Sequence, residues 1–131
     1  MAADTIKRER PKGSIKAFGS LSRTAATYNS SDLKPGNAKR THIVVDVTNV
    51  GGAGTLDLLV QGKDPVSGKY YTILDFAQIT TVSVVAGKIA PGIPVVAGLA
   101  VDDVLPTEFR VNAIVGTNAV IFSVGINIID E

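Results

Sequence analysis

The sequence predicts an all-β fold: a β-sandwich or small barrel of about six to eight strands, with an extended N-terminal arm. Three observations predict this class. The chain has 131 residues, of which 45% are hydrophobic, so one domain with a substantial core is expected. The apolar residues are mostly Val, Ile, Leu and Ala, and the branched Val and Ile favour pleated sheet. Thirteen Gly and six Pro separate short segments in which apolar and polar residues alternate.

Residues 1–40 are expected to form a basic arm and a loop. The first sixteen residues, MAADTIKRERPKGSIK, lack periodicity and have few large apolar side chains, so alone they should be disordered. Residues 18–28 are consistent with a short first strand, and residues 29–40 contain the turn signal Pro35-Gly36. Residues 1–40 carry a net charge of +6 and residues 41–131 a net charge of −5, so a basic arm precedes an acidic body.

The body is expected over residues 41–131 and begins with a strand. In residues 41–50, THIVVDVTNV, side chains alternate between the two faces. The face predicted to point inward carries Ile43, Val45 and Val47. The glycine-rich residues 51–54 are expected to form a hairpin turn.

A second hairpin is predicted over residues 55–76, TLDLLVQGKDPVSGKYYTILDF. Two alternating segments flank Asp64-Pro65-Val66-Ser67-Gly68, which has the residue types of a turn. The inward face of the first strand is expected to carry Leu56, Leu58 and Val60.

Three further strands are predicted over residues 79–85, 109–115 and 119–129, with irregular structure over residues 89–106, which contain three Pro. The last two strands alternate clearly. Their inward positions are Phe109, Val111, Ala113, Val115, Val120, Phe122, Val124, Ile126 and Ile128.

The opposite faces of these strands also carry large apolar residues, namely Val44, Leu59, Ile114 and Ile121. Four such residues on adjacent strands predict a covered surface rather than scattered exposure. The expected cover is the apolar segment 89–101 or a neighbouring subunit.

Glycine and histidine residues do not form a recognisable catalytic motif. A phosphate-binding loop needs a helix after its glycines, whereas Thr55 begins a strand. His42, the one histidine, faces away from Ile43 on its strand and is expected at the surface or at an interface rather than as a general base.

The acidic residues also fit solvent exposure better than chemistry. Asp102, Asp103 and Glu108 lack the alternating pattern of a calcium loop. Asp57 and Asp75 occupy outward positions, where a catalytic carboxylate pair is less expected than a solvated one. We therefore expect no catalytic residue, metal or cofactor.

Three other classes are disfavoured. The chain has no cysteine, which excludes disulfides and thiolate metal sites. No signal peptide follows the basic N-terminus, and Pro91 and Pro94 interrupt the most apolar segment, so neither export nor a membrane span is expected. The segment KRERPK suits phosphate contacts, but the acidic body and the scarcity of aromatic rings disfavour nucleic acid.

Four segments of the body resemble a group of small structural proteins from the virions of tailed bacteriophages. The longest is IVVDVTNVGGAGTLDLLVQGKDPVSGKYYTILDF, which is similar to their opening strands and to a TLxxxVQGxDPxSGKYYTxL hairpin. The others are ITTVSVVAG, LPTEFRVNAIVG and AVIFSVGINII. The resemblance covers about residues 41–129 and does not extend to residues 1–40.

The resemblance implies a capsid decoration, or cementing, protein that binds the outside of the expanded head, commonly as a trimer, and braces neighbouring capsomers. Its expected partners are the major capsid protein and further copies of itself. Its expected location is the capsid exterior, after synthesis in the host cytoplasm. Two alternatives remain: a minor tail or head–tail joining protein with the same fold, and a carbohydrate-binding module on the virion surface, which the low aromatic content disfavours.

The arm is expected to contact the major capsid protein or the acidic body of an adjacent copy. Exposed ion pairs are each worth only about 0–1 kcal/mol, so the basic residues should steer the arm while apolar residues anchor it. The candidate partner-binding residues are Ile6, Lys7, Arg8, Arg10, Lys12, Ile15, Lys16 and Phe18.

Overall fold

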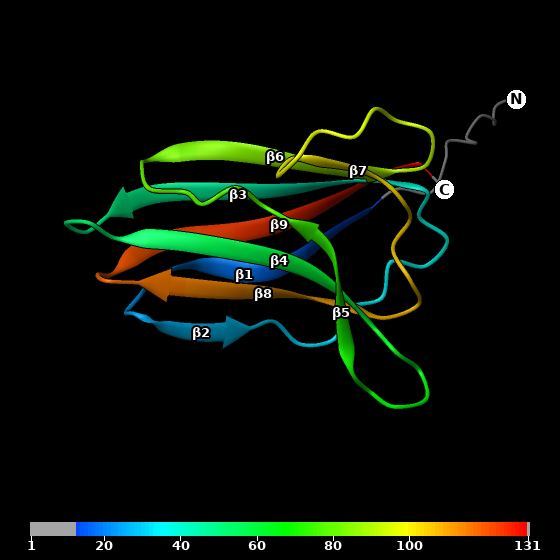
Figure 1. Ribbon diagram of the computed structural model, residues 1–131, viewed down its shortest axis with the longest axis horizontal. Coiled ribbons are helices and arrows are strands. Elements are labelled where there is room, and N and C mark those ends of the chain that lie inside the picture. Colours follow the sequence, from blue (N-terminus) through cyan, green and yellow to red (C-terminus); the bar gives the residue numbers. More distant parts are fainter. Residues whose placement is uncertain (1–12, 131) are drawn as a thin grey trace, which may run out of the picture.

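The computed structural model describes residues 13–130, which form two facing β-sheets (Figure 1). These residues contain nine strands and no helix. The strands are β1 (Gly13–Arg23), β2 (Ala26–Asn29), β3 (Arg40–Val50), β4 (Thr55–Lys63), β5 (Tyr70–Asp75), β6 (Ser83–Ala90), β7 (Ala100–Asp102), β8 (Phe109–Gly116) and β9 (Val120–Asp130). The five-stranded sheet, sheet A, has the order β1-β9-β3-β6-β7, and the four-stranded sheet, sheet B, has the order β2-β8-β4-β5. The predicted all-β class is confirmed, and of the two predicted architectures the structure has the sandwich, with nine strands where about six to eight were expected.

The strand pairing describes one long antiparallel ribbon that is folded over itself. Along the ribbon, β1 pairs with β9, β2 with β8, β3 with β6, and β4 with β5. The ribbon closes into two layers because β3 also pairs with β9 and β4 also pairs with β8. This is the topology of a jelly roll, with the short parallel strand β7 added beside β6.

The core lies between the sheets and is built from the alternating inward residues. The side chains of Ile43, Leu58, Phe109 and Phe122 are fully buried there. The inward positions predicted for β3, β4, β8 and β9 are all buried except Ile128, which is half-buried near the end of β9. The core assignment from the period-two pattern is therefore confirmed at nearly every position.

Three features differ from the sequence expectation: the extent of the arm, the position of one strand and the connection made by one turn. Residues 13–29 belong to the sandwich as β1 and β2, so an arm that extends to residue 40 does not describe them. The predicted strand over residues 79–85 is displaced because Ile79 bridges to Leu56 of sheet B, and the chain reaches sheet A only at Ser83. The turn at residues 51–54 joins strands of different sheets instead of closing a hairpin.

The outward apolar residues do not form the single covered surface that was predicted. Val44 and Ile121 lie on the outer face of sheet A, whereas Leu59 and Ile114 lie on the outer face of sheet B. The two pairs point to opposite sides of the molecule, so no single segment covers them all.

Candidate partner-binding surface

An aromatic ring contact and cation–π contacts hold strand β1 to the sandwich. The Phe18 ring meets the Phe122 ring edge to face, with 5.7 Å between centroids. The guanidinium of Arg23 lies 4.6 Å from the Phe122 centroid and 5.0 Å from that of Phe18. Arg23 also donates hydrogen bonds to the carbonyl oxygens of Phe122 at 3.1 Å and Gly19 at 3.0 Å. Burial lowers the pKa of Arg23, but the guanidinium stays charged at neutral pH.

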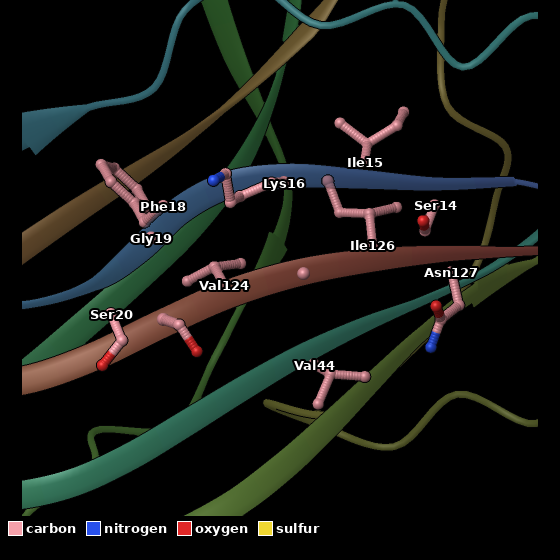
Figure 2. A pocket seen from close by; sticks show the side chains of 12 residues that line it. Ser14, Ile15, Lys16, Phe18, Gly19, Ser20, Val44, Val124, Ile126 and Asn127 are labelled. Atoms are coloured by element: carbon pink, nitrogen blue, oxygen red, sulfur yellow. The ribbon is translucent and has the colours of Figure 1, made fainter.

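A shallow groove runs along the outer side of β1 and β9 toward β3, and we call it the β1–β9 groove. Its volume is about 490 Å³. Figure 2 shows its lining side chains along these three strands. They come from Ser14, Ile15, Lys16, Phe18, Gly19, Ser20, Val44, Ser123, Val124, Gly125, Ile126 and Asn127.

Small residues form the floor of the β1–β9 groove. Gly125 pairs with Lys16 on one side and with Val44 on the other. A Cβ atom added to Gly125 would meet no atom within 4 Å, so the groove is open above it. Lys16 is the one charged side chain on the lining, and it is exposed. The groove therefore offers a mostly apolar and hydroxyl-lined surface with one positive charge at its rim.

Three of the predicted partner-binding residues lie at this groove, and they differ in role. The side chain of Lys16 is exposed, whereas that of Ile15 is half-buried against the core. Phe18 is only 8% exposed and packs in the protein's own core, and its contact with a partner stays a prediction. The remaining predicted residues, Ile6, Lys7, Arg8, Arg10 and Lys12, lie outside the described residues.

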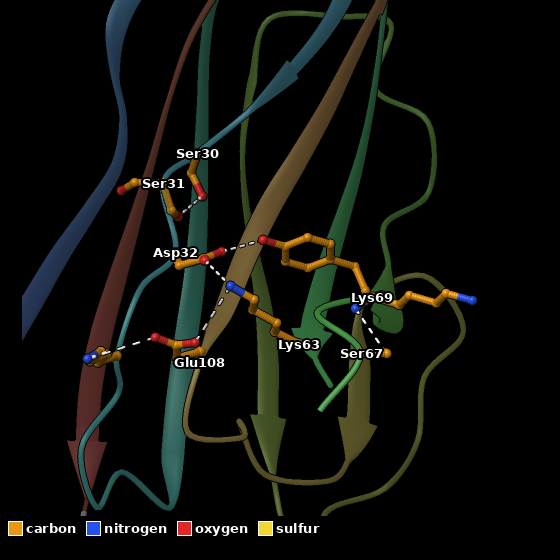
Figure 3. Close-up of polar contacts among 9 residues, drawn as sticks. Ser30, Ser31, Asp32, Lys63, Ser67, Lys69 and Glu108 are labelled. Carbon is orange, nitrogen blue, oxygen red and sulfur yellow. Dashed lines mark hydrogen bonds and ion pairs between the residues drawn. The ribbon is translucent and has the colours of Figure 1, made fainter. Parts of the chain in front are cut away.

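A polar cluster joins the loop after β2 to the end of the β4–β5 hairpin (Figure 3). The carboxylate of Asp32 accepts hydrogen bonds from Lys63 Nζ at 2.8 Å and from the Tyr70 hydroxyl at 2.6 Å. The guanidinium of Arg110 stacks 3.6 Å from the Tyr70 centroid. Glu108 lies 3.9 Å from Lys63 Nζ.

The hydrogen bonds of this cluster shift the pKa values in the expected directions. The bond from Lys63, followed by that from Tyr70, lowers the pKa of Asp32. The same contacts raise the pKa of Lys63 and of the Tyr70 hydroxyl. Each group is thus stabilised in its charge state at neutral pH, which suits a structural link rather than proton transfer. The sequence predicted the turn of this hairpin but not the polar cluster, because Asp32 and Lys63 are 31 positions apart in the chain.

The turn of the β4–β5 hairpin is held by its own side chains. Asp64 accepts hydrogen bonds from the Val66 amide at 2.9 Å and from the Ser67 hydroxyl at 2.7 Å, and the first of these contributes most to lowering the pKa of Asp64. Figure 1 shows this turn extending away from both sheets. It presents Val66, which is 94% exposed, at its tip.

The remaining candidates from the sequence occupy structural positions. Gln78 donates a hydrogen bond to Asp57 at 3.1 Å, and Asp75 is exposed on the edge of sheet B. Asp102 accepts a hydrogen bond from the Gly92 amide at 2.6 Å, and Asp103 accepts one from the Val104 amide at 2.8 Å, so both shape loops. His42 lies half-buried on the outer face of β3.

Residues 13–130 hold neither a metal-binding cluster nor a membrane-spanning helix. This part of the chain has no cluster of three or more His, Cys, Asp or Glu side chains that could hold a metal ion. It also forms no helix long and apolar enough to cross a membrane.

No family model, curated protein sequence or solved structure matches the chain.

Proposed function

We propose that this protein is a structural component of a bacteriophage virion that binds the outer surface of the head and stabilises contacts between capsomers. The observation that carries the proposal is a jelly-roll body with a groove along its first strand, directly after the basic segment KRERPK. Jelly rolls recur in viral capsid proteins as well as in lectins, so the fold supports the role by analogy. The resemblance of residues 41–129 to virion proteins supports it independently.

The β1–β9 groove is the proposed attachment surface on the body. Its floor of small residues lets a partner backbone approach the sheet closely, and its apolar lining residues contribute burial. Lys16 continues the positive charge of residues 7–12 onto the described surface, which suits an acidic strip on the capsid protein. Many copies on one shell would turn weak single contacts into a strong network.

Binding to heads assembled without this protein tests the proposal. The purified protein should co-sediment with expanded heads, and two variants should reduce its occupancy. Gly125→Gln adds a side chain over the floor of the groove, where its Cβ would meet no atom within 4 Å, and Lys16→Glu reverses the charge at the rim of the groove. Ile114→Gln, on the outer face of sheet B, is the matched control and should bind normally.

The outcomes test the head-binding role and the β1–β9 groove separately. Heads that bind none of the protein would refute the head-binding role. Heads that bind both groove variants as well as the unaltered protein would retain the role but exclude the groove. The copy number in purified virions separates decoration from a tail or joining role. A decoration protein should be present in a number of copies comparable with that of the major capsid protein. A tail or joining protein should be present only in the few copies that form one small ring. In virions the assembly is expected to be a homo-oligomer, with a trimer favoured by the resemblance.

Carbohydrate binding is a second candidate, supported by the surroundings of Tyr71. This half-exposed ring lines a pocket of about 340 Å³ with Pro65, Pro106 and Glu108. An aromatic face beside a carboxylate suits a sugar ring, and lectins share the jelly-roll topology. Glycan-array binding that Tyr71→Ala abolishes would favour this candidate, and an array without signal would exclude it for the glycans presented.

A further inference from the structure

We propose that the open edge of β6, residues 83–87, pairs with the same edge of a second copy. The two strands run antiparallel around Val85, so that sheet A continues from one chain into the next. The inference rests on the backbone and charge pattern of this edge and not on the proposed function. For the free protein in solution it predicts a two-fold dimer in place of the trimer that the resemblance favours on the virion.

Half of β6 has an unpaired edge within the part of the chain that the structure describes. On one side, β6 pairs with β3 from Ser83 to Ile89, whereas on the other side β7 pairs only with Lys88, Ile89 and Ala90. Lys88 N donates to Leu99 O at 2.9 Å, and Ala90 O accepts from Asp103 N at 3.2 Å, so the even-numbered residues direct their backbone groups away from β3.

The same alternation fixes the direction of the preceding backbone groups. The N–H and C=O groups of Val84 and Ala86 point toward the side that β7 leaves open. These four groups meet no protein partner among residues 13–130. They are available to a further strand.

This edge lacks the devices that usually protect a sheet edge. Soluble proteins block edges with charged residues, Pro or bulges. Residues 83–87, SVVAG, contain no charge and no Pro, and their register with β3 is unbroken. By contrast, β1 has two register shifts and an exposed Lys16, β5 carries Asp75, and β7 ends at Asp102. An unprotected strand of this kind is a template for pairing.

A second copy is the partner that the charge pattern favours. A two-fold axis brings a strand together with the same strand of a second copy, so that residue i faces residue j and residue j faces residue i, and like charges that face each other destabilise a sheet. The segment 80–87 is neutral throughout, so a two-fold contact here brings no like charges together. The edge strands β1, β5 and β7 each carry a charged residue, namely Lys16, Asp75 and Asp102, and the uncharged edge strand β2 has only four residues.

Centring the pair on Val85 uses the open edge fully. Val84 then exchanges two backbone hydrogen bonds with Ala86 of the second copy. The two-fold axis repeats these bonds between Ala86 and Val84 of the second copy. The paired segment ends at residue 87, before Lys88, where β7 begins to occupy the edge. A recess of about 370 Å³, lined partly by Ser83, Val85, Val96 and Leu99, gives room beside the edge for side chains of the second copy. The exposed Val84 adds apolar contact near the axis.

The molecular mass in solution, measured by light scattering over a range of concentrations, tests the pairing. The full chain should form a dimer. Val84→Glu should raise the dimer Kd at least about tenfold because two carboxylates and a lost apolar contact oppose pairing. Ala86→Pro should do the same because it removes an edge N–H while leaving β6 paired with β3. Val66→Glu is the control and should leave the Kd unchanged, since Val66 lies at the tip of the β4–β5 turn. Circular dichroism should show the same fold for all variants.

A cysteine placed at the axis tests the register. The chain has no cysteine, so each disulfide in a single-cysteine variant joins two chains. Facing residues in a non-hydrogen-bonded antiparallel pair have Cα atoms about 4.5 Å apart, within the range of a disulfide. Val85→Cys should therefore form a covalent dimer on mild oxidation, and Val66→Cys should not. A monomeric or trimeric mass, a dimer insensitive to both β6 variants, or cross-linking of Val66→Cys as readily as Val85→Cys would overturn the proposal.

Discussion

Replacing Phe18 by Ala measures whether β1 belongs to the cooperative fold. The ring is 8% exposed, packs on Phe122 and lies beneath the Arg23 guanidinium. A buried Phe removes about 150 Å² or more from water, which at about 25 cal/mol per Å² corresponds to about 3–4 kcal/mol. Because β1 is an edge strand whose neighbours can relax, we expect a loss near the lower end of the Phe→Ala range, about 3 kcal/mol.

Urea unfolding followed by fluorescence or circular dichroism measures this loss. With a slope of about 1.5 kcal/mol per molar urea, the midpoint should fall by about 2 M. Leu21→Ala is the matched control on the same strand: its side chain is 61% exposed, so a change below about 0.5 kcal/mol is expected. A loss below about 1 kcal/mol for Phe18→Ala, or equal losses for both variants, would show that β1 detaches from the sandwich and acts as the arm that the sequence suggested.

Three further results are expected. Removing residues 1–12 should leave a single cooperative thermal transition, because the strands described within residues 13–130 already form both sheets of the sandwich; loss of the transition would show that the removed segment completes the fold. Val111→Asp should abolish soluble folding, because Val111 is fully buried and an unpaired carboxylate there has no partner; soluble, folded protein would contradict the core assignment. Asp32 and Asp64 have lowered pKa values, so their stabilising contacts should be complete above the ordinary value of 3.8 and be lost as the pH falls below it, which amide exchange in the β4–β5 turn would report; unchanged exchange on acidification would contradict this link.

The sequence alone determined the class of fold and most of the core. Inward residues such as Val45, Leu58 and Phe122 could be identified because side-chain alternation along a strand is a local property of the backbone. The β4–β5 hairpin was also predictable, since its turn is specified by Asp64 and Gly68 within five residues.

Other features were decided only when distant strands met. The stretch GSIKAFGSLSR does not alternate regularly because β1 has two register shifts, and its place in sheet A depends on pairing with β9, about a hundred residues away. The turn at residues 51–54 looks like a hairpin in sequence, but β3 pairs with β6 and β9 in sheet A, whereas β4 pairs with β5 and β8 in sheet B. Local sequence patterns specify which face of a strand is apolar. Which strand lies beside it, and hence which edge stays open, depends on long-range pairing, as the contrast between β1 and β6 shows.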